Sequence, residues 1–301
     1  AWNFYVKSQS RPDSGKQTLI EYEYQYECFA EWMRKNHPEI VLLVHLTKPI
    51  AEEFAAYIAA DHAPSTFNKY RDLLLRMFRI LTNGEGENPW QGIRRKKKTP
   101  NHKIPFTADE MATIFEKAQD ELKTLLLIGY YTALRLGDVC LLFWPEIDWE
   151  RRQIRHKIRK TGKNATIPIH HELYAHLQGL FKEHGGKQKH ICPEFARGYA
   201  DGKGHRKDTG VVKIQKFLSS CGIRTHREGT GPGTGKRAVV EKGFHSLRHT
   251  WVTTCRQNGT DRATVEAIVG WGNPEMEKTY THVDDAHLAE GSQSNESRPD
   301  H

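Results

Sequence analysis

The stretch from Phe244 to Tyr280, FHSLRHTWVTTCRQNGTDRATVEAIVGWGNPEMEKTY, sets the organisation of the second half of this chain. Apolar residues recur at helical spacing from Phe244 to Cys255, which predicts a helix with one face in the core. His245 and Arg248 lie one turn apart on the neighbouring stripe of that helix. We therefore expect these two side chains to aim hydrogen-bond donors at one point.

Shorter helices are expected in the rest of the stretch. Gly259 ends the first helix, and Thr260 is placed to cap a second one, which Gly270 stops. Asn273 is placed to cap a third helix, near whose end Tyr280 can leave the core and point into a cleft. Taken singly, a histidine at a helix start is most often a cap, and a tyrosine at helical spacing is most often core. Only the combination indicates chemistry.

The combination is specific. His-x-x-Arg at 245–248, followed by Gly-Trp and then Tyr280, resembles the second conserved block of the tyrosine recombinases, the phage integrase family. The resemblance implies that Tyr280 is the nucleophile and that His245, Arg248 and Trp271 contact the scissile phosphate. Trp271 stands where histidine is commoner in the family, and both rings offer an N–H donor.

The family pattern also requires an upstream arginine. Residues 132–138, TALRLGD, resemble the first conserved block, in which Arg135 sits at a corner between two helices. Asp138 matches the family's acidic residue, and we expect it to orient Arg135. Ala133 replaces the family's glycine, and Gly137 stands where a small polar residue is frequent. Neither change removes a charge.

A small antiparallel sheet is predicted between the two blocks. Three short strands are expected at 147–149, 153–158 and 164–169, and the turn Lys160-Thr-Gly-Lys163 joins the last two. The resemblance places a catalytic lysine on this turn. We assign it to Lys160, because the family's residue directly precedes the turn, and keep Lys163 as the alternative.

The resemblance implies a site-specific recombinase that cuts and rejoins DNA without metal or ATP. Tyr280 would attack a phosphodiester to give a 3′-phosphotyrosine, while Arg135 and Arg248 hold the non-bridging oxygens. His245 is the nearest candidate base, and Lys160 is the candidate acid for the departing 5′ oxygen. Exchange through a Holliday junction implies a homotetramer on double-stranded DNA, formed from a protein that is monomeric in solution.

Two other functions share part of this pattern. A type IB topoisomerase uses the same set of side chains but relaxes DNA as a monomer; the helical first region and the spacing from Gly-Trp to tyrosine favour the recombinase. A DNA-binding architectural protein with a silent active site is the second alternative. The complete catalytic set argues against it.

Composition sets limits on the class of protein. Among 301 residues, 45 basic side chains face 37 acidic ones, a net charge of +8 that favours a polyanionic partner. The five cysteines are scattered and fit no disulfide framework. No run of about 18 apolar residues and no signal peptide occurs, so we expect a cytoplasmic protein, associated with the nucleoid when bound to DNA, and no membrane contact. No histidine or cysteine spacing fits a metal site, so we predict neither metal nor cofactor.

The expected fold class is mainly α with a small antiparallel β-sheet, in two domains. Residues 1–92 carry apolar stripes at 19–35, around 54–58 and at 67–81, and the resemblance implies a helical core-binding domain. Residues 106–290 form the catalytic domain, which opens with a capping box at Thr107 and contains further helices at 170–182 and 211–221. We expect loops at 185–210 and 227–237, and a disordered tail at 291–301.

A basic linker at 93–105 joins the two domains. It is either a solvated connection or an extended strap that crosses DNA phosphates. The candidate DNA-binding residues are Arg94, Arg95, Lys96, Lys97 and Lys98.

Overall fold

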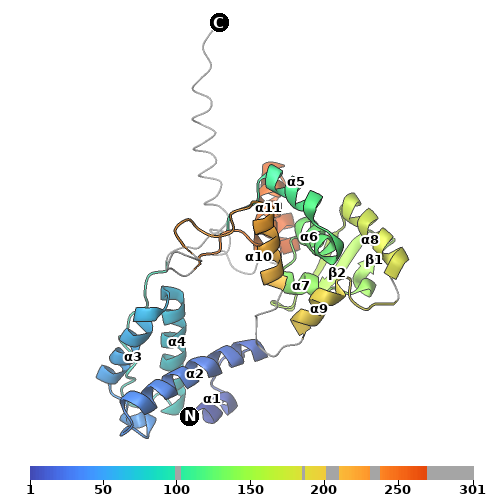
Figure 1. The fold of residues 1–301 in the computed structure, drawn as a ribbon. Helices are drawn as coiled ribbons and strands as arrows, with labels where there is room; N and C mark the ends of the chain where they lie inside the picture. Colours follow the sequence, from blue (N-terminus) through green and yellow to red (C-terminus); the bar gives the residue numbers. More distant parts are fainter. Residues whose placement is uncertain (99–102, 185–186, 201–209, 231–237, 270–301) are drawn as a thin grey trace. The chain divides into compact units, whose positions relative to one another are not determined.

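The computed structural model describes residues 1–98, 103–184, 187–200, 210–230 and 238–269. The chain divides into two compact units, residues 1–100 and the part from residue 101 onward. Figure 1 shows helices in the first unit, and helices together with a small sheet in the second. The predicted fold class is confirmed. No described helix is both long and apolar enough to cross a membrane.

The first unit is a set of helices around an aromatic core. Phe29 and Phe54 pack edge to face with ring centroids 5.0 Å apart, and Trp90 lies 5.7 Å from Phe29. Much of the predicted aromatic stripes therefore lies in the core, whereas Tyr57 is 52% exposed. The three predicted helices are present, together with a short first helix that the sequence did not suggest. The elements are α1 (Trp2–Lys7), α2 (Lys16–Asn36), the 3-10 turn η1 (Leu43–His45), α3 (Lys48–Asp61) and α4 (Pro64–Leu81).

The basic run begins as a strap attached to α4. Asn68 on α4 accepts a hydrogen bond from the Lys96 N–H (2.8 Å) and donates one to the Lys96 carbonyl (2.9 Å). Arg71 donates from Nε to the carbonyl of Ile93 (2.8 Å). Because the backbone is held at these two places, the start of the basic run is part of the first unit and not a free connection.

The second unit holds the three predicted strands in the order β1-β2-β3, with both pairs antiparallel. Along β2 the side chains alternate, so that Ile154 and His156 are buried while Arg155 and Lys157 are exposed. The elements are α5 (Ala108–Lys117), α6 (Asp120–Thr132), α7 (Leu136–Cys140), the 3-10 turn η2 (Trp144–Glu146), β1 (Ile147–Asp148), β2 (Gln153–Lys157), β3 (Asn164–Pro168), α8 (His171–His184), α9 (Pro193–Ala200), α10 (Gly210–Ser220), α11 (Phe244–Gln257) and α12 (Arg262–Val269).

The helix that carries the His-x-x-Arg motif, α11, packs closely against α6. Gly129 allows the approach, because a Cβ at that position would overlap the ring of Phe244. Phe244 and Leu247 are both buried in the core of the second unit. The first half of the predicted apolar face therefore rests on α6, whereas Trp251 and Cys255 are half-buried and pack on a separate cluster that includes Val252 and Val265.

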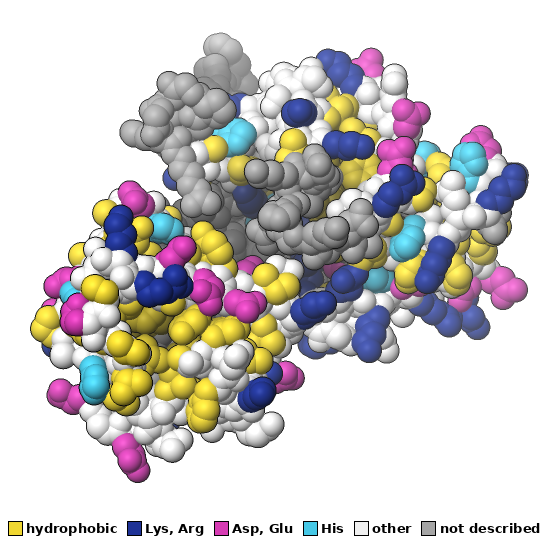
Figure 2. All heavy atoms as spheres, turned by 60° about the horizontal axis from the view of Figure 1, so that its bottom comes forward, with side chains coloured by type: hydrophobic (Ala, Val, Ile, Leu, Met, Phe, Trp, Pro, Cys, Tyr) yellow, Lys and Arg dark blue, Asp and Glu magenta, His cyan; other side chains and the backbone are white. Residues whose placement is uncertain are grey.

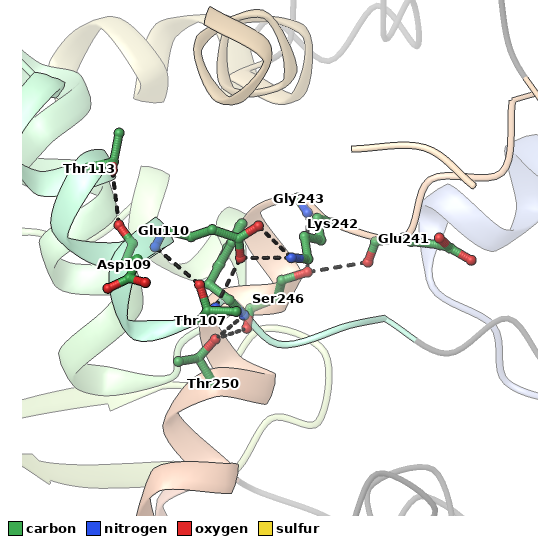
Figure 3. Close-up of polar contacts among 10 residues, drawn as sticks. Thr107, Asp109, Glu110, Thr113, Glu241, Lys242, Gly243, Ser246 and Thr250 are labelled. Atoms are coloured by element: carbon green, nitrogen blue, oxygen red, sulfur yellow. Dashed lines mark hydrogen bonds and ion pairs between the residues drawn. The ribbon is translucent and has the colours of Figure 1, made fainter. Parts of the chain in front are cut away.

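A polar joint fixes the start of α11 to the start of α5 (Figure 3). Thr107 and Glu110 form the predicted capping box, in which Thr107 Oγ1 accepts the Glu110 N–H (3.2 Å) and the Glu110 carboxylate accepts the Thr107 N–H (2.9 Å). Lys242 pairs with the same carboxylate at 2.6 Å. On α11, Thr250 Oγ1 accepts the Phe106 N–H (2.8 Å). These contacts hold the turn on which the His-x-x-Arg motif begins.

One predicted loop contains a helix. Residues 185–210 include α9, so the prediction of a continuous loop is wrong there. Glu121 on α6 caps this helix, because its carboxylate accepts the N–H groups of Glu194 (3.0 Å) and Phe195 (2.7 Å). A cap supplied by a distant element leaves no local signal in the sequence.

The cap of α12 also differs from the prediction. The carboxylate of Asp261 accepts the Thr264 N–H at 2.9 Å, so Asp261 and not Thr260 caps this helix. Gly259, predicted to end α11, follows its C-cap Asn258 with a φ of +74°, a conformation that glycine adopts at low cost. Several predictions concern residues that the structure does not describe. They are those for Gly270, the third helix, Trp271, Tyr280, the 291–301 tail and residues 231–237 of the second loop.

Candidate active site

Arg248 is fixed inside the second unit by two backbone carbonyls. Its Nη1 donates to the Ala133 carbonyl (2.9 Å) and its Nη2 to the Val269 carbonyl (2.6 Å). Only 3% of the residue is exposed. The guanidinium thus ties α11 to the end of α6 and to the end of α12, and its orientation is set before any ligand binds.

Ala133 accepts one of these bonds from an unusual backbone conformation. It is the C-cap of α6 with φ 53° and ψ 17°, the left-handed region that glycine enters most easily. This explains why the family pattern has glycine at the position. In this chain, alanine takes the same conformation and its side chain is buried.

Arg135 lies at the corner between α6 and α7, as the resemblance implied. It is the N-cap of α7 with extended backbone (φ −73°, ψ 152°), and its side chain is half-buried. Its charge lowers the pKa of Asp138 and of His245. Arg135 therefore acts electrostatically on both the buried carboxylate and the imidazole of α11.

His245 is the residue on which the candidate site converges. Burial is the largest cause that lowers its pKa, to about 4, followed by the charges of Arg248, Arg135, Lys103 and Lys160. At neutral pH the imidazole is uncharged, with one N–H donor and one acceptor nitrogen. Positive charges from four separate segments thus disfavour the charged form of this ring.

The β2–β3 turn carries Lys160 on the surface of the second unit. The turn is closed by hydrogen bonds from the Ile158 N–H to the Lys163 carbonyl (2.8 Å) and from the Gly162 N–H to the Ile158 carbonyl (2.8 Å). Gly162 has a φ of +69°, which the tight turn requires. Lys160 is exposed, and its charge is among the causes that lower the pKa of His245.

Asp138 is turned towards this hairpin. Its Oδ1 accepts the Arg159 N–H (3.0 Å) and lies 3.4 Å from Nε2 of His156. Arg135 acts on Asp138 through its charge, and these contacts lower the pKa of the carboxyl against the cost of burial. The acidic residue of the first block thus connects the arginine corner with the lysine turn.

Lys103 belongs to the site, although no motif marks it in the sequence. Its Nζ donates to the Val240 carbonyl, and the next residue, Ile104, donates its N–H to the Glu241 carbonyl (3.0 Å). Burial lowers the pKa of Lys103, and its charge acts on His245. Pairing between 103–104 and 240–241 joins segments that are far apart in the chain, and the local sequence cannot predict such a contact.

Two groups of predicted residues are not part of the second unit as the structure describes it. Trp271 and Tyr280 lie outside the described residues. Arg94 to Lys98 belong to the first unit and are described there. Within the ranges that the structure describes, no group of three or more histidine, cysteine, aspartate or glutamate side chains is placed to hold a metal ion.

Comparison with known proteins identifies the family. A model of the phage integrase family matches residues 105–287, more than half of the chain. The tyrosine recombinase XerA of Pyrococcus furiosus is 24% identical over 249 residues, which cover 80% of this chain and 79% of that protein. Two other tyrosine recombinases are matched over 64% and 65% of their own length.

Solved structures show the same fold. A lambda integrase tetramer bound to a Holliday junction has a TM-score of 0.69 and 17% identity, over 93% of this chain and 76% of that one. A lambda integrase dimer bound to a COC′ core site has a TM-score of 0.66 and 17% identity, over 91% and 90%. Together with the family match and the Arg135, His245 and Arg248 geometry, these findings make the chain a member of the phage integrase family, the tyrosine-type recombinases that transfer DNA strands.

Proposed function

We propose that this chain is a site-specific tyrosine recombinase that cleaves and rejoins double-stranded DNA without metal or ATP. The observation that supports this most directly is that Arg135, Arg248 and Lys160, from three separate elements, all act on the imidazole of His245. Burial is the largest cause of the lowered pKa of this histidine, and the positive charges of Arg248, Arg135, Lys103 and Lys160 lower it further. A site of this kind suits an anion with several oxygens, such as a phosphodiester.

The two arginines serve the phosphate. During attack the phosphorus centre gains negative charge on its non-bridging oxygens, and forked guanidinium groups can bind both oxygens. Arg248 is preorganised by its bonds to Ala133 and Val269, so little reorganisation accompanies the reaction. Removing one such donor costs about 10²–10³ in rate in comparable oxyanion sites.

The proton transfers fall to His245 and Lys160. The Tyr280 oxygen forms a bond to phosphorus while the bond to the 5′ oxygen breaks. The phenol proton passes to the neutral imidazole of His245, which has a free pair of electrons at pH 7. Lys160 gives a proton to the departing 5′ oxygen. The N–H of Trp271 donates a further hydrogen bond to the phosphate.

Strand exchange follows from the reversibility of this step. The 3′-phosphotyrosine keeps the energy of the phosphodiester, so a 5′ hydroxyl from a second duplex can attack it and release the tyrosine. We propose that a homotetramer performs this exchange through a Holliday junction, in line with the relative crystallised as a tetramer on such a junction. Arg94 to Lys98, and the adjoining strap on α4, are the proposed contacts to DNA phosphates.

A covalent trapping experiment tests the chemistry. The chain is incubated, in the presence of a metal chelator, with nicked duplexes from a randomised pool, and the products are separated on a denaturing gel. We expect a protein–DNA adduct with the original chain and none with Tyr280→Phe. Sequencing the trapped duplexes would then give the recombination site.

The same experiment separates the alternatives. Tyr280→Phe should still retard the duplexes on a native gel, because the phenol oxygen is not needed for binding. If the original chain binds the pool and gives no adduct, the silent architectural protein is the better function. If it gives an adduct and relaxes supercoiled DNA as a monomer without forming junctions, the topoisomerase is the better one.

A further inference from the structure

His156 occupies a position on β2 where the strand pattern calls for an apolar residue. Its neighbours on the buried face, Ile154 and Ile158, are apolar and almost fully buried, and His156 itself is 6% exposed. A buried polar side chain costs free energy unless it is fully hydrogen-bonded. The partners of His156 therefore indicate what the histidine is for.

Both nitrogens of the ring face a carboxylate. Nδ1 lies 2.9 Å from Oε1 of Glu146 on η2, and Nε2 lies 3.4 Å from Oδ1 of Asp138 on α7. Only the protonated ring can donate to both, and the two carboxylates raise the pKa of His156 to about 9 against the effect of burial. We call Glu146, His156 and Asp138 the hairpin anchor.

The anchor reaches the catalytic turn through one further bond. Asp138 also accepts the N–H of Arg159, the residue directly before Lys160, at 3.0 Å. From the other side, the Arg159 guanidinium lies 5.7 Å from the ring centre of Tyr199 on α9. The root of the turn is thus held on α7, whose N-cap is Arg135.

We propose that His156 is a positioning residue, which holds the β2–β3 turn on α7 so that Lys160 meets the departing 5′ oxygen. This rests on the proposed function. A buried ion network is often no more stabilising than an apolar substitute of the same volume, so stability alone gives little reason for it. What the network provides here is a fixed distance between the helix that presents Arg135 and the turn that presents the acid.

The test uses a leaving group that needs no acid. In a nicked duplex whose scissile 5′ oxygen is replaced by sulfur, the thiolate leaves unprotonated, since a thiol has a pKa near 8.5. We expect His156→Gln to slow adduct formation about tenfold or more with the oxygen substrate and to leave the sulfur substrate within about threefold, because only the acid step is disturbed. Lys160→Ala should show the same selectivity with a larger loss.

Controls keep the outcome decisive. His176→Gln removes another half-buried histidine of the same unit, which bonds Thr124 at 2.9 Å, and should leave both substrates unchanged. If His156→Gln unfolds, Asp138→Asn combined with His156→Gln avoids an unpaired buried charge and should give the same selectivity. An equal loss with both substrates overturns the positioning role. If the original chain forms no adduct with either substrate, the proposed function fails instead.

Discussion

Two histidines of the second unit lie in opposite fields. The pKa of His245 on α11 falls to about 4, while that of His156 on β2 rises to about 9. Burial disfavours the charged form of both, so the difference comes from their neighbours. Cations surround the first ring, and two carboxylates face the second. Two carboxylates offset the charge of His156, whereas the charges that lower the pKa of His245 are all cationic, which is the property expected of a candidate functional site.

The difference extends to the side chains that each region holds in place. On the α11 side, Arg248 is buried and bonded to two carbonyls. On the hairpin side, Lys160 is exposed and depends on the backbone of its turn, which Asp138 fixes through Arg159. The proposed phosphate-binding group is thus built into the core, while the candidate acid is held at the surface by an ion network.

Arg248→Lys should have the largest effect, because it removes the guanidinium that α11 holds on the Ala133 and Val269 carbonyls. The hairpin around His156 is left unchanged. A lysine cannot bond both carbonyls and also bind a phosphate with a fork, so we expect adduct formation to fall about 10²–10³-fold. The free energy of unfolding should fall by about 2–4 kcal/mol, because a buried carbonyl loses its donor. Rate measurements with nicked duplexes and urea unfolding check the two expectations.

Arg262→Lys is the matched control for this change. Arg262 is exposed at the start of α12 and pairs with Glu266 at 2.8 Å, a surface contact worth less than about 1 kcal/mol. Its replacement should leave rate and stability close to those of the original chain. Equal losses in both variants would contradict a special role for the buried arginine.

The opposite pKa shifts predict two separate pH windows for stability. The folded-state pKa of His245 is lowered, so the unfolded chain takes up the proton first and stability falls as the pH drops from about 6.5 to about 4. The folded-state pKa of His156 is raised by Glu146 and Asp138, so its contribution is complete below about 6.5 and is lost as the pH rises through about 9. Each window is worth on the order of 3 kcal/mol, at 1.36 kcal/mol per pKa unit.

Thermal unfolding across this pH range gives the test. His245→Gln should flatten the acid limb and leave the alkaline limb in place, and His156→Gln should do the reverse. Adding duplex DNA should reduce the acid limb of the original chain, because a phosphate beside His245 favours the charged ring. Two variants with the same pH profile would show that the histidines do not titrate independently.

Gly129→Ala addresses the packing that supports the α11 side. Its added methyl would overlap the Phe244 ring, which costs about 1–3 kcal/mol and exceeds the gain in helix propensity of about 1 kcal/mol. We expect a net loss of about 1–2 kcal/mol in urea unfolding and slower adduct formation. Gly179→Ala on α8, where nothing lies within 4 Å, should instead gain up to about 1 kcal/mol. If both variants lost stability, the loss in Gly129→Ala could not be assigned to the close approach of α6 and α11.

Local sequence patterns predicted much of the fold and several residues of the candidate site. Helical periodicity predicted that Phe244 and Leu247 of α11 face the core, where they pack against α6. The capping box at Thr107 is also present as predicted. Both features depend on residues only a few positions apart. The Arg135 corner and the Lys160 turn followed from their motifs. Placing these motifs in order along the chain was enough to expect them in one site.

Contacts between distant segments were beyond reach of the sequence. The cap of α9 comes from Glu121, and the segment 103–104 pairs with residues 240–241. The hairpin anchor brings together Asp138 on α7, His156 on β2 and Glu146 on η2. No sequence motif links these three residues to one another. Such groups appear only when packing brings the elements together, and they are the ones that set the charge around each histidine.

Ala133→Gly should have the smallest effect, because three contributions nearly cancel. Relief of the left-handed conformation gains about 1–2 kcal/mol. The added backbone freedom of glycine costs about 0.5–1 kcal/mol, and the buried methyl, which packs against Val252, Val265 and Val269, is worth about 0.8 kcal/mol. The free energy of unfolding in urea should therefore change by less than about 1 kcal/mol, and adduct formation should be kept, because the carbonyl that orients Arg248 remains.

Ala133→Val, which cannot adopt this backbone without strain, should lose both stability and adduct formation. If valine were tolerated, the α6 corner would not be what fixes the arginine, and the contrast between a rigid α11 side and a hairpin held at the surface would no longer hold.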